Sequence, residues 1–192
     1  ITSETGDMQD ELNLVWKYLL PAMGNKRLPA SANSVALKQK MAGLSLKAPL
    51  KNPSQATLSM ISGKTIELEK NEKNIESLSF SAAKGSYTMK MKTDTSTYSL
   101  SFAAGQWKNG VTNRKGPNLV FRAKGHFKEL PAPLVSGAYF WQDSNSLELD
   151  LRYIESPHTE KMVFHFEGKD VQIEVQNSFD ASSKIILKGK IK

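Results

Sequence analysis

Residues 146–177 read SLELDLRYIESPHTEKMVFHFEGKDVQIEVQN, and this stretch decides the expected fold. Apolar side chains fall on every second position, first at Leu147 and Leu149 and then throughout the two segments that follow. Polar or charged side chains such as Glu148 and Asp150 lie between them. Because successive side chains of a β-strand point to opposite faces, this pattern predicts strands with one dry and one wet face. Such strands are typical of an antiparallel sheet.

The same alternation recurs from residue 58 to the end of the chain. Its other apolar pairs and triplets are Leu58 and Met60, Ile66 and Leu68, Leu78 and Phe80, Tyr87, Met89 and Met91, Tyr98, Leu100 and Phe102, Leu119 and Phe121, Tyr139 and Trp141, and Ile185 and Leu187. Turn-forming residues such as Lys84-Gly85 and Ser156-Pro157 separate the runs. About ten strands joined by tight turns predict a meander, which must close into a barrel or fold over as a sandwich to hide its edges. The longest irregular piece is expected over residues 105–118.

Before residue 58 the apolar positions follow a helical period instead. One apolar stripe consists of Met8, Leu12, Val15, Trp16 and Leu19. It predicts a helix from about Asp7 to Leu20, and Pro21 marks its end because proline cannot continue a helix. A second helix is expected from about Asn33 to Gly43, and the prolines that follow it predict a linker over residues 45–55.

The composition is that of an ordinary globular protein, with 39% hydrophobic and 23% charged residues, which excludes the disordered and collagen-like classes. The net charge of +7 comes from 26 basic and 19 acidic residues and in principle suits a phosphate-bearing partner. However, the basic residues stand singly or at spacing two, as at Lys188, Lys190 and Lys192. Because single-strand binders interleave basic and aromatic residues, no nucleic-acid partner is expected.

Two further absences in the sequence narrow the classes of protein. The chain contains no cysteine, which excludes disulfides, thiolate nucleophiles and thiolate metal ligands but leaves the compartment open. No apolar run approaches the roughly 18 residues that a membrane-spanning helix needs. The sequence therefore predicts no membrane span.

One short motif resembles a catalytic signature. Ser81-Ala82-Ala83-Lys84 matches the Ser-x-x-Lys pattern of penicillin-recognising enzymes, in which the Ser begins a helix so that the Lys lies one turn away. Here the four residues close a predicted strand and enter a turn, and the chain has no Ser-Asp-Asn or Lys-Thr-Gly partner motif. We interpret the match as accidental and expect no catalytic residue in this chain.

Metal and cofactor sites are not expected either. The histidines are His126, His158 and His165, without a His-x-His pair or a His-Glu-x-x-His helix, so a zinc site would have to be assembled across distant loops. The glycines between residues 105 and 116 do not precede a predicted helix, so they do not form a phosphate loop.

The aromatic residues offer two interpretations. Trp107, Tyr139 and Trp141 are candidates for lining a ligand cavity inside a barrel. The alternative is that they fill the core. Phe140 must point away from Tyr139 and Trp141 if the strand is regular, so one of these rings is expected on an outer surface.

Both ends of the chain are similar to a known family. Residues 1–23, ITSETGDMQDELNLVWKYLLPAM, resemble the last strand and final helix of bacterial serine hydrolases of the class C β-lactamase and penicillin-binding-protein type. The remainder resembles the β domain that follows the catalytic domain in many Bacteroidetes-type members. This part of the resemblance is carried by GQW at 105–107, SGAYFW at 136–141, LDLRYIESPH at 149–158 and FHFEG at 164–168. In such proteins the nucleophilic Ser, its Lys, the Tyr and the Lys-Thr-Gly-like strand lie upstream, so the resemblance assigns no catalytic residue here.

The resemblance implies a domain organisation and a function. Residues 1–24 would be the tail strand and helix of an upstream hydrolase domain, 25–57 a helix and linker, and 58–192 an antiparallel domain that closes as a lipocalin-like barrel or a β-sandwich. The implied function is a non-catalytic C-terminal accessory domain that packs on or caps the catalytic domain of the same polypeptide. The implied location is extracytoplasmic, in the periplasm.

Two further expectations concern self-association and an alternative function. The apolar stripe of the first helix would lack its usual partner, so self-association through that stripe is predicted. The alternative function is a lipocalin-like barrel that binds a small molecule with Trp107, Tyr139 and Trp141.

Overall fold

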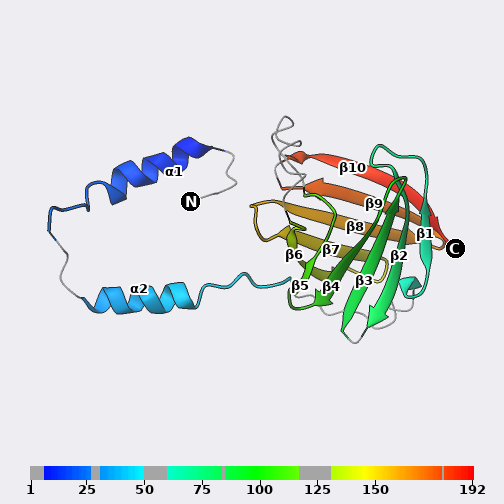
Figure 1. Cartoon of the computed structure of the whole chain (residues 1–192), viewed down its shortest axis with the longest axis horizontal. Helices are drawn as coiled ribbons and strands as arrows, with labels where there is room; N and C mark the ends of the chain where they lie inside the picture. Colours follow the sequence, from blue (N-terminus) through cyan, green and yellow to red (C-terminus); the bar gives the residue numbers. More distant parts are fainter. Residues whose placement is uncertain (1–6, 27–30, 50–59, 84, 117–130, 179) are drawn as a thin grey trace. The chain divides into compact units, whose positions relative to one another are not determined.

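The computed structural model describes residues 7–26, 31–49, 60–83, 85–116, 131–178 and 180–192 (Figure 1). They divide into two units, a helical one that ends at Leu46 and a β unit that extends from Lys47 to Lys192. None of the helices in the described part of the chain is long and apolar enough to cross a membrane. The domain boundaries expected from the sequence stay predictions.

The helical unit contains α1 (Met8–Leu14), the π-helix η1 (Val15–Leu19) and α2 (Ala32–Ala42). Asp7 caps α1 by accepting a 2.8 Å hydrogen bond from the backbone N–H of Gln9, and this satisfies a donor that the first turn leaves unpaired. The two helices expected before the β domain are therefore confirmed.

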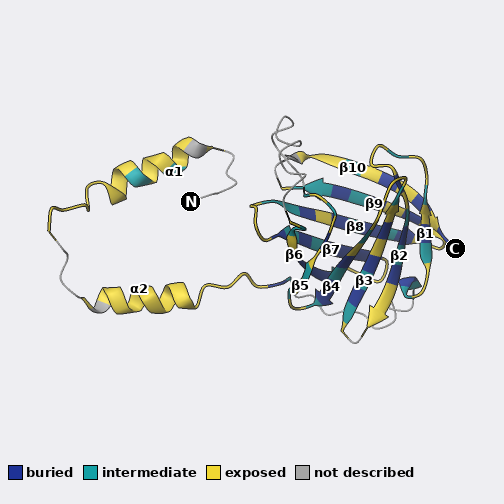
Figure 2. Cartoon of the chain, in the orientation of Figure 1, coloured by how far each residue is buried: buried dark blue, intermediate teal, exposed yellow. Residues whose placement is uncertain are grey.

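The first helix differs in one respect from the expected regular α-helix. Its second half is a π-helix, in which the N–H of Leu20 bonds the carbonyl of Val15 at 2.9 Å. Within this unit the apolar side chains of Trp16 and Leu19 are 62% and 52% exposed (Figure 2). The unit by itself therefore does not bury its apolar stripe.

Over the described residues, ten strands form one sheet. Their bounds are β1 Thr65–Leu68, β2 Ile75–Ala83, β3 Ser86–Thr93, β4 Thr97–Ala104, β5 Lys108–Val111, β6 Leu134–Trp141, β7 Ser146–Tyr153, β8 Thr159–Glu167, β9 Asp170–Asn177 and β10 Asp180–Ile191. The order in the sheet is β4-β3-β2-β1-β10-β9-β8-β7-β6-β5, with every neighbouring pair antiparallel. A further parallel pairing of β4 with β6 closes the sheet into a barrel.

Two glycines allow strands of the barrel to approach closely. A Cβ atom on Gly137 of β6 would lie 2.2 Å from the backbone oxygen of Ser101 in β4, where the barrel closes. A Cβ atom on Gly189 of β10 would lie 2.4 Å from the backbone oxygen of Glu67 in β1. Since real Cβ atoms do not tolerate such contacts, glycine is required at both positions. The predicted antiparallel meander is thus confirmed, and it forms a lipocalin-like barrel rather than a sandwich.

The two ends of the barrel differ in which strand connections lie there. The connections β6–β7 and β8–β9 lie at one end, called the β8–β9 end. The connections β7–β8 and β9–β10 lie at the other, called the β7–β8 end. Burial alternates along β8 and β9 (Figure 2), and the buried positions are apolar except for Glu160.

The structure corrects two local expectations. Residues 105–118 were expected to be irregular, but β5 lies there and pairs with β6. Its Lys-Asn-Gly-Val sequence has no alternation of apolar residues, so the pairing with β6 determines its conformation. Met60, expected in a strand with Leu58, is helical, and Gly63 at φ 75° turns the chain into β1. Leu58 and the strand expected at Leu119 and Phe121 lie outside the described residues.

Candidate functional site

The interior of the barrel is lined by large apolar side chains. Leu147, Leu149 and Leu151 of β7 are fully buried, as are the inward residues of the strands on either side. Such an interior excludes water and favours apolar contacts, either with itself or with an apolar ligand.

An unbroken series of ring contacts, called the aromatic chain, runs through this interior. It begins on β6 and returns to β6, in the order Tyr139, Tyr87, Phe80, Phe164, Phe166 and Trp141. The ring centroids of Tyr87 and Tyr139 are 4.7 Å apart, and those of Phe80 and Phe164 are 5.6 Å apart in an edge-to-face arrangement. The edge-to-face arrangement of Phe80 and Phe164 is one that aromatic pairs prefer. The aromatic chain therefore links strands from opposite parts of the sheet order.

Two members of the aromatic chain carry polar atoms without a partner. The hydroxyl Oη of Tyr87 and the indole Nε1 of Trp141 are buried, and neither has a hydrogen-bond partner in the described structure. Burial raises the pKa of Tyr87, and the nearby Tyr139 raises it further, so the hydroxyl remains a neutral donor. An unpaired buried donor of this kind destabilises a protein by about 1–3 kcal/mol. A ligand with a hydrogen-bond acceptor would satisfy it.

The β7–β8 end of the interior holds a buried ion pair. Arg114 donates to Glu160 through both terminal nitrogens, at 2.6 and 2.7 Å, and its Nη1 also donates to the hydroxyl of Tyr153 at 3.3 Å. Burial alone would lower the pKa of Arg114, but the adjacent Glu160 carboxylate outweighs it and the net shift is upward. Glu160 is 4% exposed and lies in phase with the inward residues Met162 and Phe164 of β8. Two-point pairing of this geometry is the strongest form of the arginine–carboxylate contact.

Backbone contacts hold Arg114 in this position. Thr112 is buried, its N–H bonds the carbonyl of Pro133 at 3.2 Å, and its hydroxyl accepts from the N–H of Arg114 at 3.2 Å. Gly116 lies against the ring of Tyr153, where a Cβ would stand 3.0 Å from Cδ1. The segment from Thr112 to Gly116 therefore packs against the β7–β8 end. Nearby on β9, the buried Oδ1 of Asn177 has no hydrogen-bond partner among the described residues.

The structure brings together two of the three residues predicted to line a ligand site. Tyr139 and Trp141 both point into the barrel and are 4% and 2% exposed. Trp107 is on the outside, with the guanidinium carbon of Arg152 lying 5.2 Å from its ring centroid. Phe140 lies between the two inward rings and is half-buried on the opposite face.

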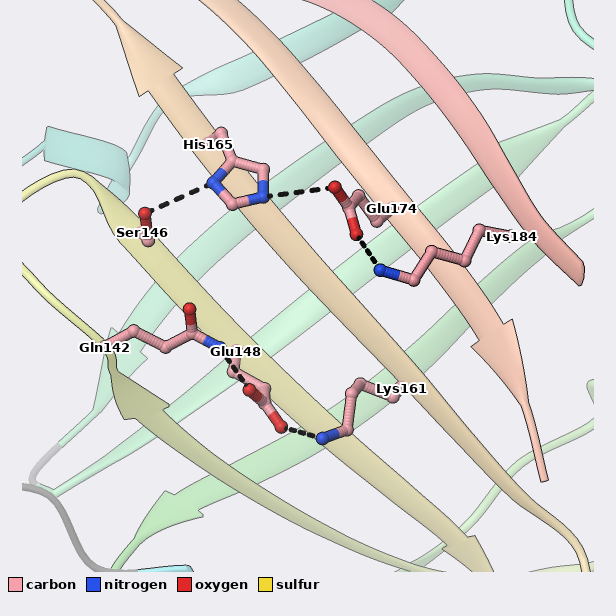
Figure 3. Close-up of polar contacts among 7 residues, drawn as sticks. All are labelled: Gln142, Ser146, Glu148, Lys161, His165, Glu174 and Lys184. Carbon is pink, nitrogen blue, oxygen red and sulfur yellow. Dashed lines mark hydrogen bonds and ion pairs between the residues drawn. The ribbon is translucent and has the colours of Figure 1, made fainter. Parts of the chain in front are cut away.

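A second polar cluster lies on the outer face of β7 to β10 (Figure 3). The Ser146 hydroxyl is 3.2 Å from Nδ1 of His165, whose Nε2 is 3.7 Å from Oε1 of Glu174. Lys184 pairs with the other oxygen of Glu174 at 2.9 Å. Glu148, although buried, accepts a hydrogen bond from Gln142 and pairs with Lys161.

This outer cluster resembles a Ser-His-acid arrangement only in composition. Ser146 is 7% exposed, so its hydroxyl is closed to a substrate, and each carboxylate of the cluster already has a lysine partner. The cleft that the cluster lines, with a volume of about 330 Å³, has polar and charged walls. We assign it a role in joining the strands rather than in chemistry.

The histidines do not assemble a metal site in the described part of the chain. His158 lies in the β7–β8 connection and His165 on the outer face of β8, whereas His126 is outside the described residues. Within those limits no cluster of three or more possible metal ligands occurs. Ser81, the first residue of the Ser-x-x-Lys match, is in β2, and Lys84 is outside the described residues.

Arg114, Glu160 and Tyr87 are site residues that the sequence alone did not indicate. Arg114 lies in a segment without periodicity and 46 positions before Glu160, so no local pattern connects them. Glu160 did carry a signal, since it is in phase with the inward residues of its own strand. Tyr87 looked like any other inward apolar residue of β3.

Comparison with known proteins gives similarities at the level of structure. The chain matches no family model and no curated protein. It is similar to the fatty-acid-binding protein of Drosophila melanogaster brain, with 13% identity, TM-score 0.46, and 68% of this chain and 98% of that chain covered. It is also similar to the Schistosoma mansoni fatty-acid-binding protein in complex with arachidonic acid, with 12% identity, TM-score 0.49 and coverages of 70% and 97%. The Manduca sexta fatty-acid-binding protein matches with 13% identity, TM-score 0.45 and coverages of 68% and 98%.

These comparisons correct the expected family and function. The matched proteins are small barrel proteins covered over nearly their whole length, not C-terminal domains of hydrolases. The predictions that the chain belongs to a class C β-lactamase or penicillin-binding-protein type hydrolase, and that it caps such an enzyme, are wrong. The resemblance rested on the opening residues 1–23 and on alternating strand segments, and unrelated antiparallel sheets share such segments. Self-association through the apolar stripe and an extracytoplasmic location stay predictions.

Proposed function

We propose that the barrel binds a small apolar molecule in its interior and does not transform it. The observation that carries the proposal is a pair of polar atoms, Tyr87 Oη and Trp141 Nε1, that lie among apolar and aromatic side chains and have no hydrogen-bond partner among the described residues. A phenylalanine at either position would pack without this penalty, as Phe80, Phe102 and Phe164 do. Polar atoms whose partners come from a ligand would explain why these two positions are not phenylalanine.

Absence of catalysis is part of the proposal. The charged side chains of the outer cluster are paired with one another, and the serine of that cluster is buried. We expect the purified chain not to hydrolyse a p-nitrophenyl ester above the rate of a buffer control. A rate that one substitution abolishes would contradict this part.

A matched pair of tryptophan variants tests binding. An uncharged polarity-sensitive dye such as Nile red is titrated into the full chain and into the variants Trp141→Phe and Trp107→Phe. The same substitution removes an indole N–H inside the barrel in one case and outside it in the other. Since a neutral hydrogen bond contributes about 0.5–1.5 kcal/mol, Trp141→Phe should weaken binding by about two- to tenfold, and Trp107→Phe should leave it unchanged.

Two results would overturn the proposal. One is the lack of saturable dye binding at one molecule per chain in the unmodified protein. The other is an equal effect of the two variants, which would place the dye elsewhere. Circular dichroism of each variant checks that the barrel is intact.

A further inference from the structure

We infer that the ligand of the barrel is an uncharged molecule, an apolar body with a hydroxyl or carbonyl group, and that Arg114 and Glu160 set this preference. The inference rests on the proposed binding function and adds the chemical class of the ligand. It follows from the positions of the charged side chains around the interior and from the partners with which they pair.

The interior holds no free charge in the described part of the chain. Every described lysine is exposed, and Arg152 lies on the outer face beside Trp107. The shielded carboxylates Glu148 and Asp150 alternate with the inward leucines of β7, so they also face outward. Arg114 and Glu160 are therefore the charged pair that faces inward.

Arg114 already pairs with Glu160, a residue of the same chain. Both terminal nitrogens point at Glu160, and a third contact goes to Tyr153. A ligand carboxylate could reach the guanidinium only by displacing Glu160 or by lying beside its negative charge. An amine would meet the converse problem at Glu160, whose two oxygens both accept from Arg114. Burying an ion without a counter-charge is far more costly than burying a neutral polar group.

Among the described residues that face inward, the unused hydrogen-bonding capacity belongs to neutral groups. Tyr87 offers a hydroxyl and Trp141 an N–H, while Asn177 offers a buried amide oxygen. A ligand hydroxyl or carbonyl can accept from Tyr87 and Trp141 at the β8–β9 end, and at the opposite end a hydroxyl can donate to Asn177. An apolar alcohol, ester or ketone therefore matches the groups that are left.

Four ligands with the same alkyl chain test the inference: a fatty alcohol, the methyl ester, the acid and the amine, each displacing Nile red from the full chain at neutral pH. The unmodified protein should bind the alcohol and the ester at least about tenfold more tightly than the acid or the amine, which corresponds to about 1.4 kcal/mol. Glu160→Gln leaves Arg114 without its counter-charge and should improve binding of the acid by about tenfold. Arg114→Gln should improve binding of the amine instead.

The double variant Arg114→Gln, Glu160→Gln is the matched control. It has no interior charge, so it should return to a preference for the alcohol and the ester. If the single variants do not fold, the preference for a neutral ligand is still tested by comparing ester with acid binding in the unmodified protein and in the double variant.

The outcomes separate this inference from the proposed function. If Nile red does not bind, the binding function fails. If the dye binds and the unmodified protein takes the acid as tightly as the ester, the function stands and the neutral-ligand inference is overturned. If Glu160→Gln folds and its affinity for the acid is unchanged, the role of the ion pair is overturned.

Discussion

The two ends of the barrel interior use polar groups in opposite ways. At the β8–β9 end the hydroxyl of Tyr87 is buried and has no partner among the described residues, whereas at the β7–β8 end the hydroxyl of Tyr153 accepts from Arg114. Burial does not explain the difference, because Tyr87 is 1% and Tyr153 4% exposed. The comparison indicates that the protein itself satisfies the tyrosine hydroxyl at one end, whereas the tyrosine hydroxyl at the other end has hydrogen-bonding capacity left for a ligand.

The largest expected effect comes from breaking the Arg114–Glu160 ion pair at the β7–β8 end. Replacing Arg114 or Glu160 alone by alanine leaves a buried charge without a counter-charge, so each change should lower the free energy of unfolding by about 3–5 kcal/mol. Replacing both, as Arg114→Met with Glu160→Leu, should cost much less because no isolated charge remains. Urea unfolding of the three variants measures this. Losses that simply add in the double replacement would contradict a mutually satisfied pair.

Removing a polar group at the β8–β9 end should have the opposite effect on stability. Tyr87→Phe removes a hydroxyl that has no partner in the described part of the chain, so in the ligand-free protein it should raise the free energy of unfolding by about 1 kcal/mol. It should also weaken binding of the alcohol ligand. Thermal unfolding with and without ligand measures both effects. A loss of stability in the ligand-free protein would show that the Tyr87 hydroxyl does have a partner.

Tyr153→Phe is the matched counterpart. It removes a hydroxyl that accepts from Arg114 at 3.3 Å, so it should lower the free energy of unfolding, by about 0.5–1 kcal/mol. The effect is smaller than that of breaking the ion pair because Glu160 still satisfies Arg114. Urea unfolding at one temperature compares the two tyrosine variants. Equal signs for Tyr87→Phe and Tyr153→Phe would remove the distinction between the ends.

Much of this fold is predictable from alternation alone. The inward leucines of β7 and the inward residues of β8 and β9 follow directly from their period of two, and so does the opposite direction of Phe140 between Tyr139 and Trp141. Closure of the barrel is not predictable in the same way. It depends on two register pairs between β4 and β6 and on the close approach that Gly137 permits. Neither leaves a periodic signal.

The site was less predictable than the fold, for a physical reason. Whether an inward polar atom has a partner depends on residues far away in sequence, and a strand pattern contains only local information. The phase of Glu160 shows that a carboxylate faces inward, but only the structure shows that Arg114 neutralises it. Trp107 illustrates the converse, because an aromatic residue between strands can lie over either face.

The smallest expected effect comes from the Glu174–Lys184 ion pair on the outer face. It serves as a comparison for the buried contacts of the interior. A hydrogen bond from Lys184 is the main cause that lowers the pKa of Glu174 below its usual 4.5; burial opposes it, and the charges of Lys184 and His165 add to the lowering. A carboxyl whose pKa is lowered by folding stabilises the folded state above its unfolded pKa, and this contribution is lost as the pH falls through the folded pKa. Glu174→Gln should therefore lower the free energy of unfolding by about 0.5 kcal/mol or less at neutral pH, and by nothing at a pH below the folded pKa. Urea unfolding at both pH values tests this, with Lys184→Gln expected to show the same loss. A loss that persists in acid would mean that Glu174 acts through packing, and the contrast between a screened outer contact and the buried Arg114–Glu160 pair would need another basis.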